Sequence, residues 1–211
     1  ARYNPLTYAG DVIELLDQLE LDPAVFVGTS LGGLVTMTVA GMAPQRIAAA
    51  ILNDVGPQLE QTGLERIRSY VGKEARFNSW EEAAAAIARN NRHVPAIWSE
   101  ADWVNAARRA CREDGDAIVL DYDPAIALPF QVKGPTPRVD MWPLFKALAQ
   151  KPLLVLRGAE SDLLSAAALE KMQAAAPDAS FVTVPGAGHA PTLDEPEARA
   201  AIDAFLDPLA T

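Results

Sequence analysis

The sequence predicts an α/β fold in which a parallel sheet is covered by helices on both faces. Short apolar runs alternate with longer segments of helical periodicity, so the expected strands are joined by helices and run parallel. Half of the 211 residues are hydrophobic, which is enough apolar material for a core on each side of a sheet. The expected strands are residues 25–27, 47–52, 152–158 and 180–184.

The first expected strand leads into the segment around which the chain is organised. Apolar residues recur at helical spacing from Thr7, its expected cap, to Leu19, and Asp22-Pro23 ends this helix before the strand. The pentapeptide Gly28-Thr-Ser-Leu-Gly32 follows, and a second helix extends to Met42. A G-x-S-x-G sequence between a strand and a helix is typical of a sharp turn that lifts a serine hydroxyl clear of the sheet. Ser30 is therefore the candidate nucleophile.

Residues 58–141 differ in character from the segments that flank them. Apolar stripes and capping patterns at Ser79 and Ser99 indicate helices joined by polar turns. The proline-rich stretch 121–137 is expected to be irregular. We interpret 58–141 as an inserted helical lid between two parts of one core, residues 1–57 and 142–211. Aromatic residues at helical spacing more often pack in a core than line a pocket, but the tryptophans within this segment and at its exit are the pocket candidates: Trp80, Trp98, Trp103 and Trp142.

Three polar side chains follow expected strands and supply the groups of a nucleophilic hydrolase. Ser30, Asp162 and His189 occur in that order, and functional groups of a parallel sheet collect at the carboxyl ends of its strands. A serine needs an imidazole to take its proton, and the imidazole needs a carboxylate to fix its tautomer. His93 is the alternative histidine and is expected to be solvated. Asp54, which follows the second strand, is the alternative carboxylate.

Composition excludes several other classes of protein. The net charge of −10 opposes binding to nucleic acid. No segment is long and apolar enough to span a membrane, and none resembles a signal peptide, so a cytoplasmic protein without a membrane partner is expected. The single cysteine, Cys111, is expected on a buried helical face. Neither a metal site nor a cofactor is predicted, because the sequence has no C-x-x-C or paired-histidine motif.

The motifs around Ser30, Asp162 and His189 together resemble those of the α/β-hydrolase superfamily. Gly28-Thr-Ser-Leu-Gly-Gly33, Leu156-Arg-Gly-Ala-Glu-Ser-Asp-Leu-Leu-Ser165 and Pro185-Gly-Ala-Gly-His-Ala-Pro191 carry the likeness. The nearest group is the lidded bacterial set of enol-lactonases, C–C hydrolases, esterases and cofactor-free haloperoxidases. The resemblance implies Ser30 as nucleophile, Asp162 as acid, His189 as base and the Leu31 amide as one oxyanion donor.

The resemblance also implies that this chain corresponds to the second half of the family's sheet. The family has earlier strands, one of which ends in a loop that supplies a second oxyanion donor. We therefore expect an N-terminal segment of the same gene product as a partner, and an exposed apolar edge at strand 25–27 without it. A homo-oligomer is also compatible with such an edge.

The leading hypothesis is a serine hydrolase that cleaves a small ester, lactone or thioester through an acyl-enzyme on Ser30. The alternatives are a C–C bond hydrolase or perhydrolase of the same fold, and a non-catalytic small-molecule receptor built on that fold. The sequence does not separate these alternatives.

Overall fold

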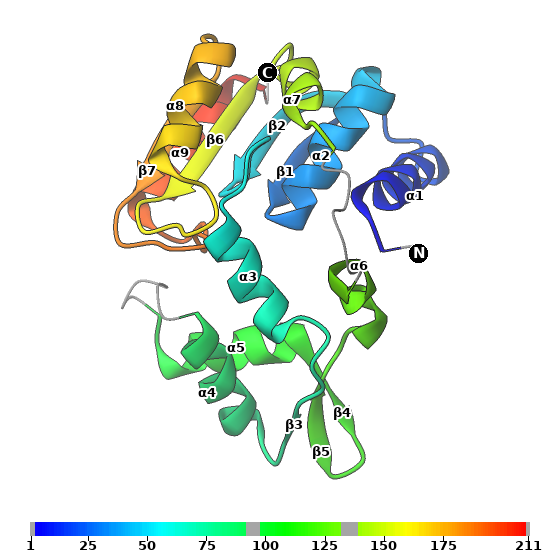
Figure 1. Ribbon diagram of the computed structural model, residues 1–211, viewed down its shortest axis with the longest axis vertical. Helices are drawn as coiled ribbons and strands as arrows, with labels where there is room; N and C mark the ends of the chain where they lie inside the picture. Colours follow the sequence, from blue (N-terminus) through cyan, green and yellow to red (C-terminus); the bar gives the residue numbers. More distant parts are fainter. Residues whose placement is uncertain (1–2, 92–97, 132–138, 210–211) are drawn as a thin grey trace.

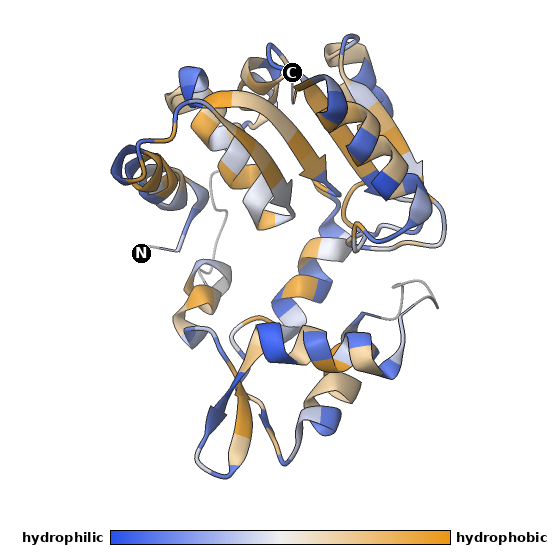
Figure 2. Cartoon of the chain, turned by 180° about the vertical axis from the view of Figure 1, so that it is seen from behind, coloured by the Kyte–Doolittle hydropathy of each residue, from blue (hydrophilic) through white to orange (hydrophobic). Residues whose placement is uncertain are grey.

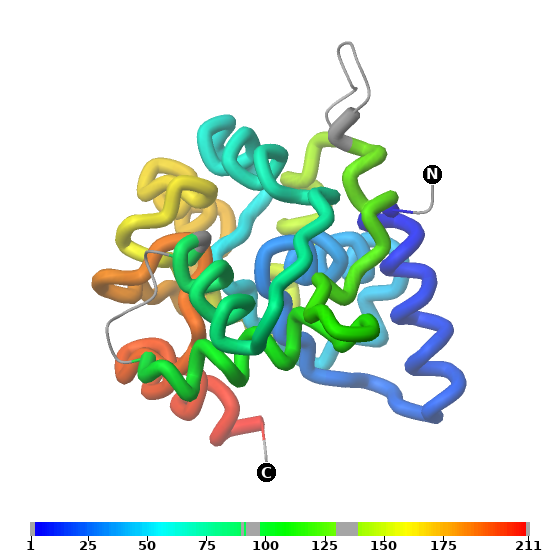
Figure 3. Tube along the Cα trace, turned by 90° about the horizontal axis from the view of Figure 1, so that it is seen from below, coloured from blue at the N-terminus to red at the C-terminus, as the bar shows by residue number. Residues whose placement is uncertain are grey.

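The computed structural model describes residues 3–91, 98–131 and 139–209, so His93 lies outside the described residues. A sheet with its covering helices forms one part of the molecule, and α3 (Gln61–Tyr70) extends from it to a second, smaller part (Figure 1). The view from below shows this smaller part in front of the sheet (Figure 3). The smaller part is formed from within residues 58–141, which we call the inserted segment.

Among the described residues, the main sheet has four parallel strands in the order β1-β2-β6-β7. They are β1 (Ala24–Thr29), β2 (Ile47–Asn53), β6 (Leu153–Gly158) and β7 (Ser180–Val184). All four strands predicted from the apolar runs are confirmed. In the register of β1 and β2, Thr29 is paired with Asn53, so the residues that follow the two strands lie side by side.

Alternate residues of the central strands point into two separate cores. Leu52 and Val155 belong to the core under α1, α2, α7 and α8, whereas Ile51 and Leu154 belong to the core under α9. The central strands are accordingly almost wholly hydrophobic, as the view from behind shows (Figure 2). This pattern is expected of a parallel sheet with both faces covered. The α/β class predicted from the sequence is confirmed.

In the described part of the chain, five α-helices pack around the main sheet. They are α1 (Pro5–Gln18), α2 (Leu31–Met42), α7 (Trp142–Leu148), α8 (Ala166–Ala175) and α9 (Pro196–Leu206). The first begins earlier than predicted, because Asn4 rather than Thr7 is its cap and accepts the Thr7 N–H at 3.0 Å. Short 3₁₀ turns cover Pro44–Arg46 and Asp207–Leu209.

The inserted segment is not purely helical, contrary to the prediction. Besides α3, it contains α4 (Trp80–Asn90), α5 (Glu100–Ala110), a 3₁₀ turn (Pro124–Ala127) and α6 (Leu128–Gln131). It also contains an antiparallel sheet of β3 (Arg76–Phe77), β5 (Ala117–Leu120) and β4 (Cys111–Asp114). The tight turn at Gly115, whose φ is +62°, reverses the chain between β4 and β5.

The caps predicted for α4 and α5 are confirmed, but Cys111 lies elsewhere than expected. The Ser79 and Ser99 side chains accept the N–H groups of Glu82 and Asp102. Cys111 follows the last turn of α5 and begins β4, and its buried thiol packs in a small apolar cluster of the inserted segment. Burial raises the pKa of this thiol.

Candidate active site

Ser30 occupies the turn between β1 and α2 in a backbone conformation that non-glycine residues rarely adopt. Its φ and ψ are +51° and −115°. The turn is held because the Ser30 N–H donates to the Asn53 carbonyl at 3.1 Å, and the Gly33 N–H donates back to the Ser30 carbonyl at 3.0 Å. A strained residue of this kind persists only where its surroundings fix it, and such residues cluster at functional sites.

Two glycines allow the helix to approach the strand closely at this turn. A Cβ at Gly28 would lie 2.7 Å from backbone atoms of Gly32 and Gly33. A Cβ at Gly33 would lie 2.3 Å from the Val55 side chain. Substitution at either position would therefore push α2 off the sheet and move Ser30. The Leu31 N–H belongs to the first turn of α2, where backbone donors lack partners within the helix.

His189 lies between Ser30 and Asp54. Its Nε2 is 2.9 Å from Ser30 Oγ, and its Nδ1 is 2.8 Å from Asp54 Oδ2. The Asp54 carboxylate is fully buried, and the His189 side chain is 7% exposed. A carboxylate on Nδ1 fixes the tautomer in which Nε2 is free to accept the serine proton. The three groups are arranged to activate the Ser30 hydroxyl.

The prediction that Asp162 contacts His189 is wrong. The Asp162 carboxylate instead accepts two hydrogen bonds from Arg66 of α3, at 2.6 Å from Nε and 2.8 Å from Nη2. The Arg66 guanidinium holds the pKa of Asp162 below its usual range. Asp162 therefore connects the loop after β6 to the inserted segment, and Asp54, the alternative named from the sequence, faces the imidazole.

The strand register explains why Asp54 rather than Asp162 reaches this position. Asp54 comes directly after β2, as Ser30 comes directly after β1, and the two strands are neighbours. Asp162 comes four residues after the end of β6, one strand further from Ser30. In the sequence, Asp54 lies closer than Asp162 to the end of an expected strand, but the strand order that decides between the two aspartates appears only in the structure.

Two buried polar residues, Asn53 and Glu195, hold the His189 loop. Asn53 donates from Nδ2 to Thr29 Oγ1 at 3.1 Å and to the Pro191 carbonyl at 2.9 Å. Glu195 accepts the backbone N–H groups of Thr192 and Leu193 at 2.9 and 3.0 Å. The ends of β1 and β2 are thereby tied to the loop that carries His189.

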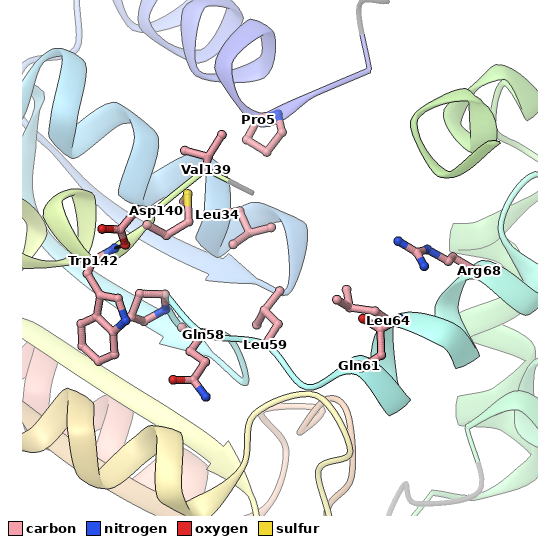
Figure 4. Close-up of a pocket in the computed structure, with 13 residues that line it drawn as sticks. Pro5, Leu34, Gln58, Leu59, Gln61, Leu64, Arg68, Val139, Asp140 and Trp142 are labelled. Atoms are coloured by element: carbon pink, nitrogen blue, oxygen red, sulfur yellow. Dashed lines mark hydrogen bonds between the residues drawn. The ribbon is translucent and has the colours of Figure 1, made fainter. Parts of the chain in front are cut away.

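An open cavity of about 900 Å³ lies beside this end of the sheet (Figure 4). Its lining includes Leu34, which is one helical turn after Ser30, and residues that follow Asp54 from Gly56 to Leu59. Across the cavity, α3 contributes Leu64 and Arg68 (Figure 4). The volume suits a small organic molecule.

Of the four tryptophans predicted as pocket residues, Trp142 lines this cavity. The other three pack within the inserted segment. The rings of Trp98 and Trp103 meet edge to face with centroids 4.7 Å apart, and the Arg108 guanidinium lies 4.6 Å from the centre of the Trp80 ring. These three tryptophans stabilise the second part of the molecule rather than line the described cavity.

The described residues contain neither a metal-binding cluster nor a membrane-spanning helix. Within residues 3–91, 98–131 and 139–209, no group of three or more His, Cys, Asp or Glu side chains is arranged to hold a metal ion. Across the same ranges, no helix has the length and hydrophobicity needed to cross a membrane.

Two curated proteins are similar to this chain over most of its length. The 3-hydroxybutyrate-oligomer hydrolase of Cupriavidus necator is 37% identical over 199 residues, an alignment that covers 90% of this chain and 67% of that protein. The 2-(acetamidomethylene)succinate hydrolase of Mesorhizobium japonicum is 31% identical, with 97% of this chain and 72% of that protein covered.

Solved structures agree with this relationship. A crystal structure of an alpha/beta hydrolase from Novosphingobium aromaticivorans superimposes with a TM-score of 0.88 at 50% identity, and covers 98% of this chain and 73% of that one. The structure of E-2-(acetamidomethylene)succinate hydrolase superimposes with a TM-score of 0.82 at 25% identity, with coverage of 99% and 75%. A sequence profile of the alpha/beta hydrolase family matches residues 2–202 of this chain. The chain belongs to the alpha/beta hydrolase family.

Proposed function

We propose that this protein is a serine hydrolase that cleaves a small carboxylic ester through an acyl-enzyme on Ser30. The observation that carries the proposal is the continuous contact from Ser30 Oγ to His189 Nε2 and from His189 Nδ1 to Asp54 Oδ2. The names of the two curated relatives, both hydrolases, support the reaction class.

Each group has a role that follows from its place. Ser30 Oγ attacks the ester carbonyl as His189 Nε2 takes its proton, and buried Asp54 stabilises the imidazolium that forms. The Leu31 N–H donates to the oxyanion of the tetrahedral intermediate. His189 then returns the proton to the leaving alcohol, and water cleaves the acyl-enzyme by the same steps. General-base help of this kind contributes about 10²–10⁴ in rate.

The cavity favours an ester whose acyl part is mainly apolar. Leu34, Leu59 and Leu64 are among the apolar residues that line the cavity, with Trp142 at one side. Arg68 and Gln61 of α3 supply polar groups on the other side (Figure 4). A short hydroxyacid ester, which has an apolar body and polar ends, matches this mixture of side chains. The 3-hydroxybutyrate dimer is therefore the first substrate to assay.

We also propose that β1 pairs with a further strand of the same gene product, and that this strand brings the second oxyanion donor. In the described part of the chain, β1 pairs only with β2, and Val25 and Val27 on this strand are 43% and 55% exposed. An apolar edge strand of this kind invites pairing. Equal turnover by these 211 residues and by a longer gene product would contradict this second proposal.

The test of the enzymatic proposal is covalent labelling of the native protein by a fluorophosphonate, with Ser30→Ala as the control. Intact mass spectrometry should show one adduct on the native protein and none on the variant. A native protein that stays unlabelled, or a variant labelled to the same extent, contradicts the proposal. The receptor alternative predicts no adduct together with tight retention of a small molecule.

A further inference from the structure

Besides its contact with His189, the Asp54 carboxylate accepts hydrogen bonds from Gly158 and Ser161. Its Oδ1 accepts the backbone N–H of Gly158 at 2.8 Å, and its Oδ2 accepts the Ser161 hydroxyl at 2.6 Å. The Ser161 hydroxyl and His189 Nδ1 thus contact the same carboxylate oxygen. This oxygen faces the imidazole, so its position determines how His189 is oriented toward Ser30.

The hydrogen bonds that Ser161 Oγ accepts leave only one direction in which its hydroxyl can donate. The backbone N–H groups of Leu163 and Leu164 both donate to Ser161 Oγ, at 3.2 and 3.0 Å. A hydroxyl has two acceptor positions and one proton. Because the two N–H groups occupy both acceptor positions, the proton is directed at Asp54 Oδ2. A charge-assisted bond of this kind is stronger than one between neutral groups.

The turn that contains Ser161 is held from one side by the first helix of the inserted segment. The Asp162 carbonyl accepts the Gly63 N–H at 3.1 Å and the Thr62 hydroxyl at 3.2 Å. The Leu163 carbonyl accepts the Glu60 N–H at 2.9 Å. The ion pair between Arg66 of α3 and Asp162 adds a further contact to this turn.

A buried arginine holds the same turn from the sheet side. Arg157, the residue before the last of β6, donates from Nε to the Leu164 carbonyl at 2.8 Å and from Nη2 to the Ala159 carbonyl at 3.3 Å. The turn is therefore fixed between the sheet and α3, and it presents Ser161 to Asp54.

We propose that Ser161 is a positioning residue for this hydrolase. It orients the Asp54 carboxylate toward His189, and α3 holds it in place through the backbone of residues 162–163. This inference rests on the proposed function, because it concerns the same imidazole and nucleophile. If Ser161 has this role, the placement of α3 helps to determine how reactive Ser30 is. The same helix lines the cavity with Leu64 and Arg68.

The test compares Ser161→Ala with Ser161→Thr in the native protein. Loss of a hydrogen bond to a charged group should lower kcat by about tenfold to a hundredfold and leave KM within about twofold. The threonine variant restores a hydroxyl and should recover most of kcat. Hydrolysis of p-nitrophenyl butyrate and the rate of fluorophosphonate labelling provide the two readouts.

Ser165→Ala is the matched control. Ser165 lies four residues further along the same loop and caps α8 by accepting the Ala168 N–H at 3.2 Å, so its loss lowers stability and should leave kcat unchanged. A Ser161→Ala variant that behaves like Ser165→Ala, or a threonine variant as slow as the alanine one, overturns the proposal. Labelling of Ser30→Ala would instead refute the hydrolase mechanism itself.

Gly63→Ala tests the contribution of α3 without removing any polar group. A Cβ at this position would lie 2.7 Å from the Asp162 carbonyl oxygen and 2.8 Å from Leu163 Cα. We expect at least a threefold loss in kcat that is not additive with Ser161→Ala, since both changes disturb one contact. An unchanged kcat in Gly63→Ala overturns the role of α3. If Ser161→Ala does not fold, kcat of Gly63→Ala is the measurement that tests whether the Ser161 turn positions Asp54.

Discussion

Asp54 and Asp162 follow neighbouring strands of the same sheet, yet their environments differ in every respect that matters for chemistry. Asp54 is fully buried and is paired with an imidazole, whereas the Asp162 side chain is 35% exposed and is paired with Arg66. An arginine is always charged, so it neutralises its partner permanently. The charge of Asp54 is opposed only when His189 takes a proton. The role of a carboxylate at a strand end is therefore set by its partner in the folded chain rather than by its place in a motif.

Asp54→Asn should have the largest effect. An amide in place of the carboxylate offers an N–H to His189 Nδ1, which favours the tautomer that cannot accept the Ser30 proton. We expect kcat for ester hydrolysis to fall by about 10³–10⁴-fold with a small change in KM. Steady-state kinetics of Asp54→Asn and Asp162→Asn would measure the difference in kcat between the two variants. Losses of similar size would contradict the assignment of Asp54 as the partner of His189.

Gly158→Ala should have an intermediate effect, because it disturbs the surroundings of Asp54 without changing a charge. A Cβ here would lie 2.3 Å from the Gly188 carbonyl oxygen and 2.6 Å from that of Ala187, in the loop that carries His189. Displacement of a catalytic group by about 1 Å is enough to lower kcat by about 10²-fold.

Gly10→Ala is the control for this glycine substitution. Gly10 lies within α1 with open space around it, so alanine there should leave kcat unchanged and raise thermal stability slightly. A Gly158→Ala variant with native kcat would contradict the expectation that displacement of the His189 loop lowers activity.

Asp162→Asn should have the smallest effect on activity, less than tenfold, and its main effect should be on stability. Because the folded-state pKa of Asp162 is depressed by Arg66, the ion pair contributes stability above the ordinary carboxyl pKa. That contribution is lost as pH falls through the depressed value, where the protonated aspartic acid resembles asparagine.

Thermal unfolding of both proteins between pH 7 and pH 2 would follow this loss. The difference in melting temperature should be largest near neutral pH and should shrink toward zero in acid. Since both partners are about one-third exposed, solvent screens the pair and keeps the effect small. A difference that grows on acidification would contradict the assignment of the ion pair.

Much of the fold and part of the site could be predicted from the sequence. The four strands were recognisable because buried parallel strands are continuous apolar runs, and Ser30 because its motif joins a strand to a helix. The partner of His189 was not predicted, since the choice between Asp54 and Asp162 depends on strand order and on Arg66, which is 96 residues away from Asp162 in the sequence.

The inserted segment shows a second limit of prediction. Its capped helices were recognisable from local patterns, whereas β3, β4 and β5 are short and form a sheet only by pairing with one another. Trp80 and Trp103 were pocket candidates because aromatic residues suit both packing and binding, and only their neighbours in the folded chain separate these roles.

We propose that Asp54, and not Asp162, activates Ser30 through His189. The most direct measurement is the rate at which a fluorophosphonate labels Ser30 in the native protein, in Asp54→Asn and in Asp162→Asn, followed by intact mass. We predict a rate reduced by more than about a hundredfold in Asp54→Asn and a rate within about threefold of native in Asp162→Asn. Slow labelling of Asp162→Asn together with native labelling of Asp54→Asn would show that Asp162, and not Asp54, assists His189.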